Sequence, residues 1–125
     1  MNSYLLPSIT IVLSLISGSA KGADWTLITK DPSADVALSI DRESIERISE
    51  TVMRVRMKYE YAEPRKFDGK YIKELLVCNE YDCGKDTYRI LWSEGYFTDG
   101  THQEDTSERR GHLLPDDAAY RYLCK

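Results

Sequence analysis

Three cysteines are the residues of this sequence most able to form a covalent bond within the chain. Cys78, Cys83 and Cys124 allow one disulfide and leave one thiol over. In an extended strand the first two would lie about 16 Å apart on opposite faces, whereas a disulfide needs Cα atoms within about 7 Å. That pair would need an intervening turn, so the spacing favours Cys83–Cys124. Cys78 is then either a buried small side chain or a free thiol available for dimerisation, and we expect burial.

The two histidines do not form a recognisable catalytic pair. Both lie in a polar stretch, and neither accompanies a Ser or Cys in the strand-to-helix turn that is typical of a nucleophile. The sequence also lacks CxxC spacing and a glycine-rich phosphate loop. A metal site would have to use residues whose spacing matches no zinc or EF-hand pattern: Asp99, His102, Glu104, Asp105 and His112. We therefore predict a non-enzymatic protein without a metal or cofactor.

The charge of the chain favours a protein partner over nucleic acid. Its 125 residues carry a formal net charge of −4, whereas binding to phosphates needs a basic face. Tyr and Arg are common where proteins bind one another, and the chain has nine tyrosines, although Tyr also suits half-buried strand positions. The one basic row, Arg54, Arg56 and Lys58, is therefore a candidate protein-binding face. The alternative is an ordinary solvated strand face.

Residues 1–22 have the composition of a secretory signal peptide. Leu5–Ile16 is an apolar run that is short for a membrane span, and small residues follow it. Cleavage after Ala20 fits as well as cleavage after Gly22, although the run has no Lys or Arg before it. A buried N-terminal strand or helix is the alternative. We expect export, one mature domain over residues 23–125, and no transmembrane segment after signal removal.

The longest pattern in the mature part is a strict alternation over residues 51–61. Apolar residues occupy the odd positions from Met53 to Tyr61, and charged residues occupy the even positions from Arg54 to Glu60. Such a pattern predicts a strand with one buried face and one solvated face. Further strands are expected at residues 25–29, 36–40 and 87–93, with an edge strand and hairpin turn at 96–101 and either one strand or a bent pair at 71–83. Apolar residues lie on both faces in the middle of 71–83, which indicates a central position in the sheet or a bulge.

The remaining segments predict connections and a helix. Residues 62–69 contain proline and glycine and predict a loop. Residues 103–111 are polar without periodicity and predict a second, mobile loop. Pro115 and the two aspartates after it predict the start of a short helix that ends at Cys124. The expected fold class is α+β: an antiparallel β-sheet of five to six strands with a short C-terminal helix packed on it.

A series of short motifs runs in order along the mature chain: Trp25, Asp41-x-x-Ser44-Ile45, Glu80-Tyr81-Asp82-Cys83, Tyr88-Arg89, Tyr96, Asp99-Gly100, Leu114-Pro115-Asp116 and Cys124. Taken together, the series resembles the surface-adhesin protein E family of small exported bacterial proteins. The resemblance implies an antiparallel sheet with a C-terminal helix, tied by a Cys83–Cys124 disulfide. For the best-known member it also implies surface display and binding of extracellular-matrix proteins such as vitronectin and laminin.

Two functions fit the sequence. The first is an exported, adhesin-like protein that binds a protein partner, which can include a host-matrix protein. The second is a periplasmic accessory protein, with a homodimer formed through an edge strand or Cys78. The best-known family member is lipid-anchored through an N-terminal cysteine, and this chain has no cysteine before Cys78. We therefore expect a periplasmic or secreted location more than surface display.

Overall fold

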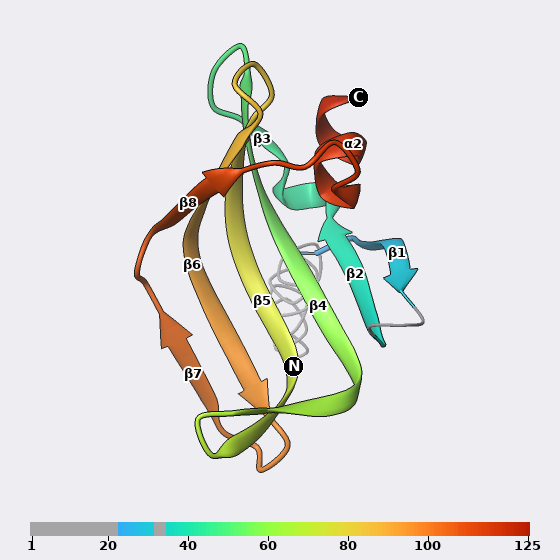
Figure 1. Ribbon diagram of the computed structural model, residues 1–125, viewed down its shortest axis with the longest axis vertical. Coiled ribbons are helices and arrows are strands. Elements are labelled where there is room, and N and C mark those ends of the chain that lie inside the picture. The colour runs from blue at the N-terminus through green and yellow to red at the C-terminus, as the bar shows by residue number, and fades with distance from the viewer. Residues whose placement is uncertain (1–22, 32–34) are drawn as a thin grey trace, which may run out of the picture.

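Antiparallel strands form most of the protein in a computed structural model that describes residues 23–31 and 35–125 (Figure 1). The signal peptide predicted at residues 1–22 lies outside the described residues and stays a prediction, as does the division into a signal and a mature domain. The elements in chain order are β1 (Trp25–Asp31), β2 (Val36–Asp41), the 3-10 helix η1 (Arg42–Ser44), β3 (Glu46–Arg47), β4 (Val52–Phe67), β5 (Lys70–Asp82), β6 (Thr87–Phe97), β7 (His102–Asp105), β8 (Arg109–His112) and α2 (Ala118–Cys124).

The strands form one open sheet in the order β1-β2-β4-β5-β6-β7. Two short strands lie beside this path, because β3 pairs with one end of β4 and β8 pairs with β6. Every pairing is antiparallel, which short connections between sequential strands allow. The predicted class, an antiparallel sheet with a C-terminal helix, is confirmed. The main path has six strands, within the expected five to six, and β3 and β8 add two more in the described part of the chain.

The longest strand, β4, places the core as its alternation predicts. The side chains of Val55 and Met57 are 0% and 1% exposed. The loop predicted at residues 62–69 is wrong, because the strand continues to Phe67 before it turns. Pro64 lies in a register shift where β4 has residues without a partner on β5. The N–H that proline lacks is not needed there, so the strand tolerates it.

The two strands after β4 form long pairings with bulges. β5 matches the strand predicted at 71–83, and it shifts register against β6 at two places, where a bulge was one of the two expectations. The sequence predicts two strands, 87–93 and 96–101, where the structure has the single strand β6. The intervening Gly95 pairs with both neighbours, Leu75 on β5 and Gln103 on β7, so the ladder continues through it.

The polar stretch at residues 103–111 is not the loop that the sequence predicts. Its two ends belong to β7 and β8, which pair with different halves of β6. Most side chains of both strands are exposed, so they form without an alternation of apolar and polar residues, through backbone hydrogen bonds. Gly111 suits this position because a Cβ atom there would lie 2.7 Å from the ring of Tyr88.

The C-terminal helix α2 packs on one face of the sheet and is joined to it covalently. The carboxylate of Asp117 caps the helix by accepting a hydrogen bond from the Tyr120 backbone N–H at 2.8 Å. Ala119 and Tyr120 are buried against the sheet. A disulfide joins Cys83, after β5, to Cys124, with Cα atoms 5.5 Å apart. The predicted helix and the predicted Cys83–Cys124 disulfide are both confirmed.

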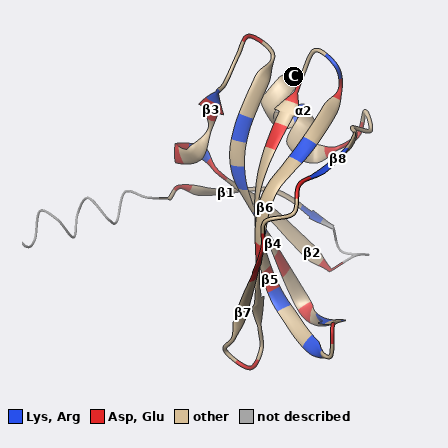
Figure 2. Ribbon diagram, turned by 90° about the vertical axis from the view of Figure 1, so that its left-hand side faces the viewer, with Lys and Arg blue, Asp and Glu red and all other residues tan. Residues whose placement is uncertain are grey.

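The two faces of the sheet differ in character. The face that carries α2, called the helix face, holds the hydrophobic core: Leu38, Ile40, Val55, Met57, Tyr81 and Ala119. The opposite face, called the charged face, carries the basic row and the carboxylates across from it. Figure 2 shows basic and acidic segments on neighbouring strands at the end of the sheet where α2 lies. Cys78 also lies on the charged face and is only 7% exposed, so its predicted burial is confirmed.

Candidate functional site

The basic row predicted as a candidate protein-binding face lies on one side of β4, as its alternation requires. Each member contacts a side chain on another strand of the sheet. Arg54 reaches a carboxylate on β5, and Arg56 donates a hydrogen bond to Asp41 on β2. The ammonium nitrogen of Lys58 lies 4.6 Å from the centroid of the Trp25 ring, a cation–π distance. Lys58 is therefore the member whose contact is with a ring and not with a carboxylate.

Asp41, the partner of Arg56, has a structural role. Its side chain is 0% exposed, and one carboxylate oxygen accepts the backbone N–H groups of Asp24 at 2.8 Å and Glu43 at 3.1 Å. The second bond caps the 3-10 helix η1. The other oxygen accepts from Arg56. A buried carboxylate is tolerated only when its oxygens are satisfied in this way, so this end of the charged face is fixed by internal contacts.

Glu80 on β5 is the centre of the charged face. One oxygen accepts hydrogen bonds from Nε and Nη2 of Arg54 at 3.0 and 2.7 Å, and the other accepts from Nη2 of Arg89 at 2.7 Å. The side chain of Glu80 is 10% exposed. Burial acts to raise the pKa of its carboxyl group, but the hydrogen bonds and charges of the two arginines outweigh burial and lower that pKa. Glu80 is therefore an anion that forms ion pairs with two cations.

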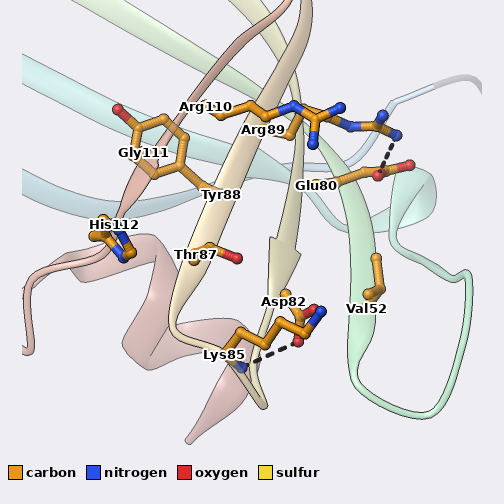
Figure 3. A pocket seen from close by; sticks show the side chains of 10 residues that line it. All are labelled: Val52, Glu80, Asp82, Lys85, Thr87, Tyr88, Arg89, Arg110, Gly111 and His112. Atoms are coloured by element: carbon orange, nitrogen blue, oxygen red, sulfur yellow. Dashed lines mark hydrogen bonds and ion pairs between the residues drawn. The ribbon is translucent and has the colours of Figure 1, made fainter.

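A pocket of about 500 Å³ lies next to this cluster (Figure 3). Arg89 and Arg110 are directly opposite each other on β6 and β8, and Figure 3 shows their side chains at one end of the pocket. Glu108 offsets this like-charge pair, because it lies 3.5 Å from both guanidinium groups. The pocket could hold a polar group, but its charges are mixed and largely paired. Its lining consists of Val52, Glu80, Asp82, Lys85, Thr87, Tyr88, Arg89, Arg110, Gly111 and His112.

The two histidines lie apart, on different strands. Nδ1 of His102, at the start of β7, is 2.8 Å from Oε2 of Glu94 on β6. His112, at the end of β8, lines the pocket of Figure 3. The five residues considered as metal ligands are thus spread over the length of this edge of the sheet. Over residues 23–31 and 35–125, no three His, Cys, Asp or Glu side chains gather closely enough to hold a metal ion.

A second hollow, of about 360 Å³, lies on the helix face at the end of the sheet away from α2. Its floor is apolar and its rim is basic. The sequence does not reveal this hollow, because its residues come from five strands, β4 to β8, and the stretch that holds β7 and β8 is predicted as a loop. One signal in the sequence was available: Phe67 lies beside basic residues in a stretch predicted to be exposed.

The family model for surface-adhesin protein E matches residues 25–118, which is most of the described chain. The chain belongs to this family. The resemblance drawn from the ordered motifs is therefore confirmed. The adhesin E family is one of surface adhesins and not of enzymes, which agrees with the predicted class of protein.

Solved structures of protein E from Haemophilus influenzae have the same fold. One has a TM-score of 0.57 at 14% identity and covers 80% of this chain and 83% of that chain. A second structure, crystal form II of the same protein, has a TM-score of 0.55 at 14% identity, and the match covers 82% of this chain and 96% of that chain. Protein E from non-typeable Haemophilus influenzae has a TM-score of 0.52 at 14% identity, and the match covers 78% of this chain and 74% of that chain. Similarity at this level of identity shows the fold alone.

Two further findings complete the comparison with known proteins. No curated protein sequence matches the chain significantly. Among the helices that the structure describes, none has both the length and the apolar character that a membrane span requires.

Proposed function

We propose that this member of the adhesin E family is an exported, non-enzymatic protein that binds a protein partner. The observation that carries the proposal is the family match over residues 25–118. The Cys83–Cys124 disulfide supports export, because such bonds persist in oxidising compartments outside the cytosol. Extracellular-matrix proteins such as vitronectin and laminin are the partners that the family resemblance suggests.

Binding is tested by passing the oxidised protein over immobilised vitronectin and, separately, over immobilised laminin at physiological salt. The proposal expects retention at micromolar protein concentration. A circular dichroism spectrum of the same sample establishes that the sheet is folded. If neither surface retains the folded protein, binding to these two matrix proteins is excluded.

The basic row of Arg54, Arg56 and Lys58 is the first surface proposed for the partner. Lys58→Glu is the most informative change, because it reverses a charge without breaking an ion pair to a buried carboxylate. We expect weaker retention of this variant, whereas Lys30→Glu, the same change at an exposed position on β1, serves as the control. Equal retention of both variants would exclude the basic row from the interface.

The compartment and the oligomeric state are part of the same proposal. We propose a periplasmic or secreted location, which cell fractionation and protease treatment of intact cells distinguish from surface display. Degradation by external protease would favour display at the surface. For a homodimer, the burial of Cys78 favours pairing through an edge strand such as β1 over a disulfide between copies. Sedimentation with and without reductant separates these two forms of dimer.

A further inference from the structure

The sheet is much longer than the helix that covers it. The seven residues of α2 span about 10 Å at 1.5 Å per residue, whereas the sixteen residues of β4 span roughly 50 Å at 3.3 Å per residue. Figure 1 shows α2 at the end of the sheet opposite the turn between β4 and β5. The described chain therefore packs a helix on only one end of the helix face. The groove of about 360 Å³ occupies the other end.

The floor of this groove is made of apolar side chains. Ile72 and Leu75 from β5 line it together with Phe97 from β6, and Phe67 at the end of β4 remains 56% exposed beside them. Gly95 leaves room for the Ile72 side chain, because a Cβ atom at position 95 would lie 2.9 Å from Cδ1 of Ile72. A concave, largely apolar hollow with a few charged groups around it is the usual form of a binding site.

The rim of the groove is basic. Its charged lining consists of three cations, Arg65, Lys66 and Arg109, against one carboxylate, Asp105. The carboxylate is engaged by Arg109 at 3.1 Å, and the guanidinium of Arg65 lies 4.7 Å from the centroid of the Tyr61 ring. The local excess of positive charge is opposite in sign to the net charge of −4 on the chain. Charge complementarity therefore selects an acidic occupant.

We propose that this groove binds a segment of a protein partner in which carboxylate side chains flank aliphatic or aromatic ones. The apolar side chains of the segment cover the floor, and its carboxylates pair with the cations of the rim. The proposal rests on the proposed function as a protein-binding module and deepens it by naming a second surface, apart from the basic row, and the chemistry of what that surface binds. A second copy of this chain is the competing occupant.

The test uses an acidic probe peptide, Asp-Glu-Phe-Glu-Leu-Asp-Glu with blocked ends, titrated into the ¹⁵N-labelled, oxidised protein. Backbone amide shifts report where the peptide binds. We expect shifts at Gly95 and Gln103 in the groove and none at Arg56 on the charged face. A matched peptide with Lys in place of every acidic residue controls for binding that is only apolar. It should leave the spectrum unchanged.

Two substitutions at the groove test the roles of charge and of the apolar floor. Lys66→Glu should weaken binding of the acidic peptide about fivefold, because it exchanges an attraction for a repulsion at an exposed site. Phe67→Ser should weaken it by a similar factor, because it removes exposed apolar contact area. Lys30→Glu, the same charge reversal on β1, should bind like the wild type.

The proposal is overturned by equal binding of the acidic and basic peptides, by amide shifts confined to the charged face, or by no shift at millimolar peptide. Shifts of the groove amides that depend on protein concentration alone would assign the groove to a second copy and also overturn it. None of these results depends on vitronectin or laminin. Failure of the groove and failure of the proposed function are therefore separate results.

Discussion

Replacing Glu80 by Gln tests whether the charged face is held together by charge. The substitution keeps the size and shape of the side chain but removes an anion that is 10% exposed and bound to Arg54 and Arg89. The three hydrogen bonds to this carboxylate are charge-assisted, and each such bond contributes roughly 1.5–3 kcal/mol. Gln retains one oxygen acceptor and turns its amide N–H groups towards the other arginine.

The expected loss is smaller than the sum of those bonds. The side chains of the two arginines are 39% and 33% exposed, so water solvates them once the anion is removed. We expect Glu80→Gln to lower the free energy of unfolding by about 2 kcal/mol at pH 7. For a domain of about 100 residues, this corresponds to a fall of roughly 10 °C in Tm.

Urea unfolding followed by circular dichroism, at pH 7 and at acidic pH, measures this loss. Because the folded-state pKa of Glu80 is lowered, its contribution is present above the unfolded-state pKa of about 4.3. The contribution is lost as the pH falls through the lowered folded-state pKa. The difference between the wild type and Glu80→Gln should therefore shrink in acid.

Glu46 provides the matched control for this experiment. It also lies near Arg54, at 3.7 Å, but its side chain is 61% exposed. Glu46→Gln should change the free energy of unfolding by less than about 0.5 kcal/mol. Equal losses for Glu46→Gln and Glu80→Gln, or a Glu80→Gln loss that persists unchanged in acid, would refute the role assigned to the buried charge.

Four further predictions follow from the core and the cysteines. Reduction of Cys83–Cys124, which closes a loop with a sequence separation of 41, should cost about 4 kcal/mol in the chain-entropy model; an unchanged urea midpoint with dithiothreitol would contradict this. Burial raises the pKa of the Cys78 thiol, so Ellman's reagent should react with it more slowly in the native protein than in urea; equal rates would show that the thiol is accessible. Burial also raises the pKa of Tyr59 to about 12, so its contribution to stability is complete below the unfolded-state value of about 10 and is lost as the pH rises towards 12. Burial raises the pKa of Tyr81 as well, so alkaline difference spectroscopy should show at least two late tyrosine ionisations, and a single midpoint near 10 would count against this. Oδ1 of Asn79 is buried without a hydrogen-bond partner among the described residues, but Nδ2 donates to the buried Tyr81 hydroxyl at 3.2 Å, so Asn79→Leu should destabilise by about 1 kcal/mol in a thermal melt; an unchanged or higher Tm would show that the unsatisfied oxygen outweighs this bond.

The core of the protein could be predicted because the alternation in β4 is regular. Alternation places Val55 and Met57 on the same face of β4, and that face is the one buried under the helix. The disulfide could be predicted for a similarly local reason. An extended segment from Cys78 to Cys83 would separate the two too widely to be bridged, which left Cys124 as the partner of one of them. In the structure β5 ends at Asp82, and it is Cys83, just after it, that bonds to Cys124.

The strands at the edge could not be predicted from side-chain patterns. Most side chains of β7 and β8 are exposed, and a segment with little to bury shows no period. Backbone hydrogen bonds to β6 hold both strands, and such bonds leave little trace in the sequence. The groove was missed for the same reason, since Gln103 and Arg109 of its lining come from these strands.

The partners of the basic residues depend on register, and register here depends on one bulge. From the pair of Cys78 with Trp92, an unbroken antiparallel ladder would set Glu80 opposite Ile90 and turn Arg89 towards the helix face. The observed pair is Glu80 with Arg89, because β6 contains one extra residue at this point. The extra residue places Ile90 on the helix face and Arg89 on the charged face. Arg89 there donates a hydrogen bond to the buried carboxylate of Glu80. A bulge is set by the fit of two strands over their whole length, so the sequence of either strand alone predicts neither its position nor the ion pair that it creates.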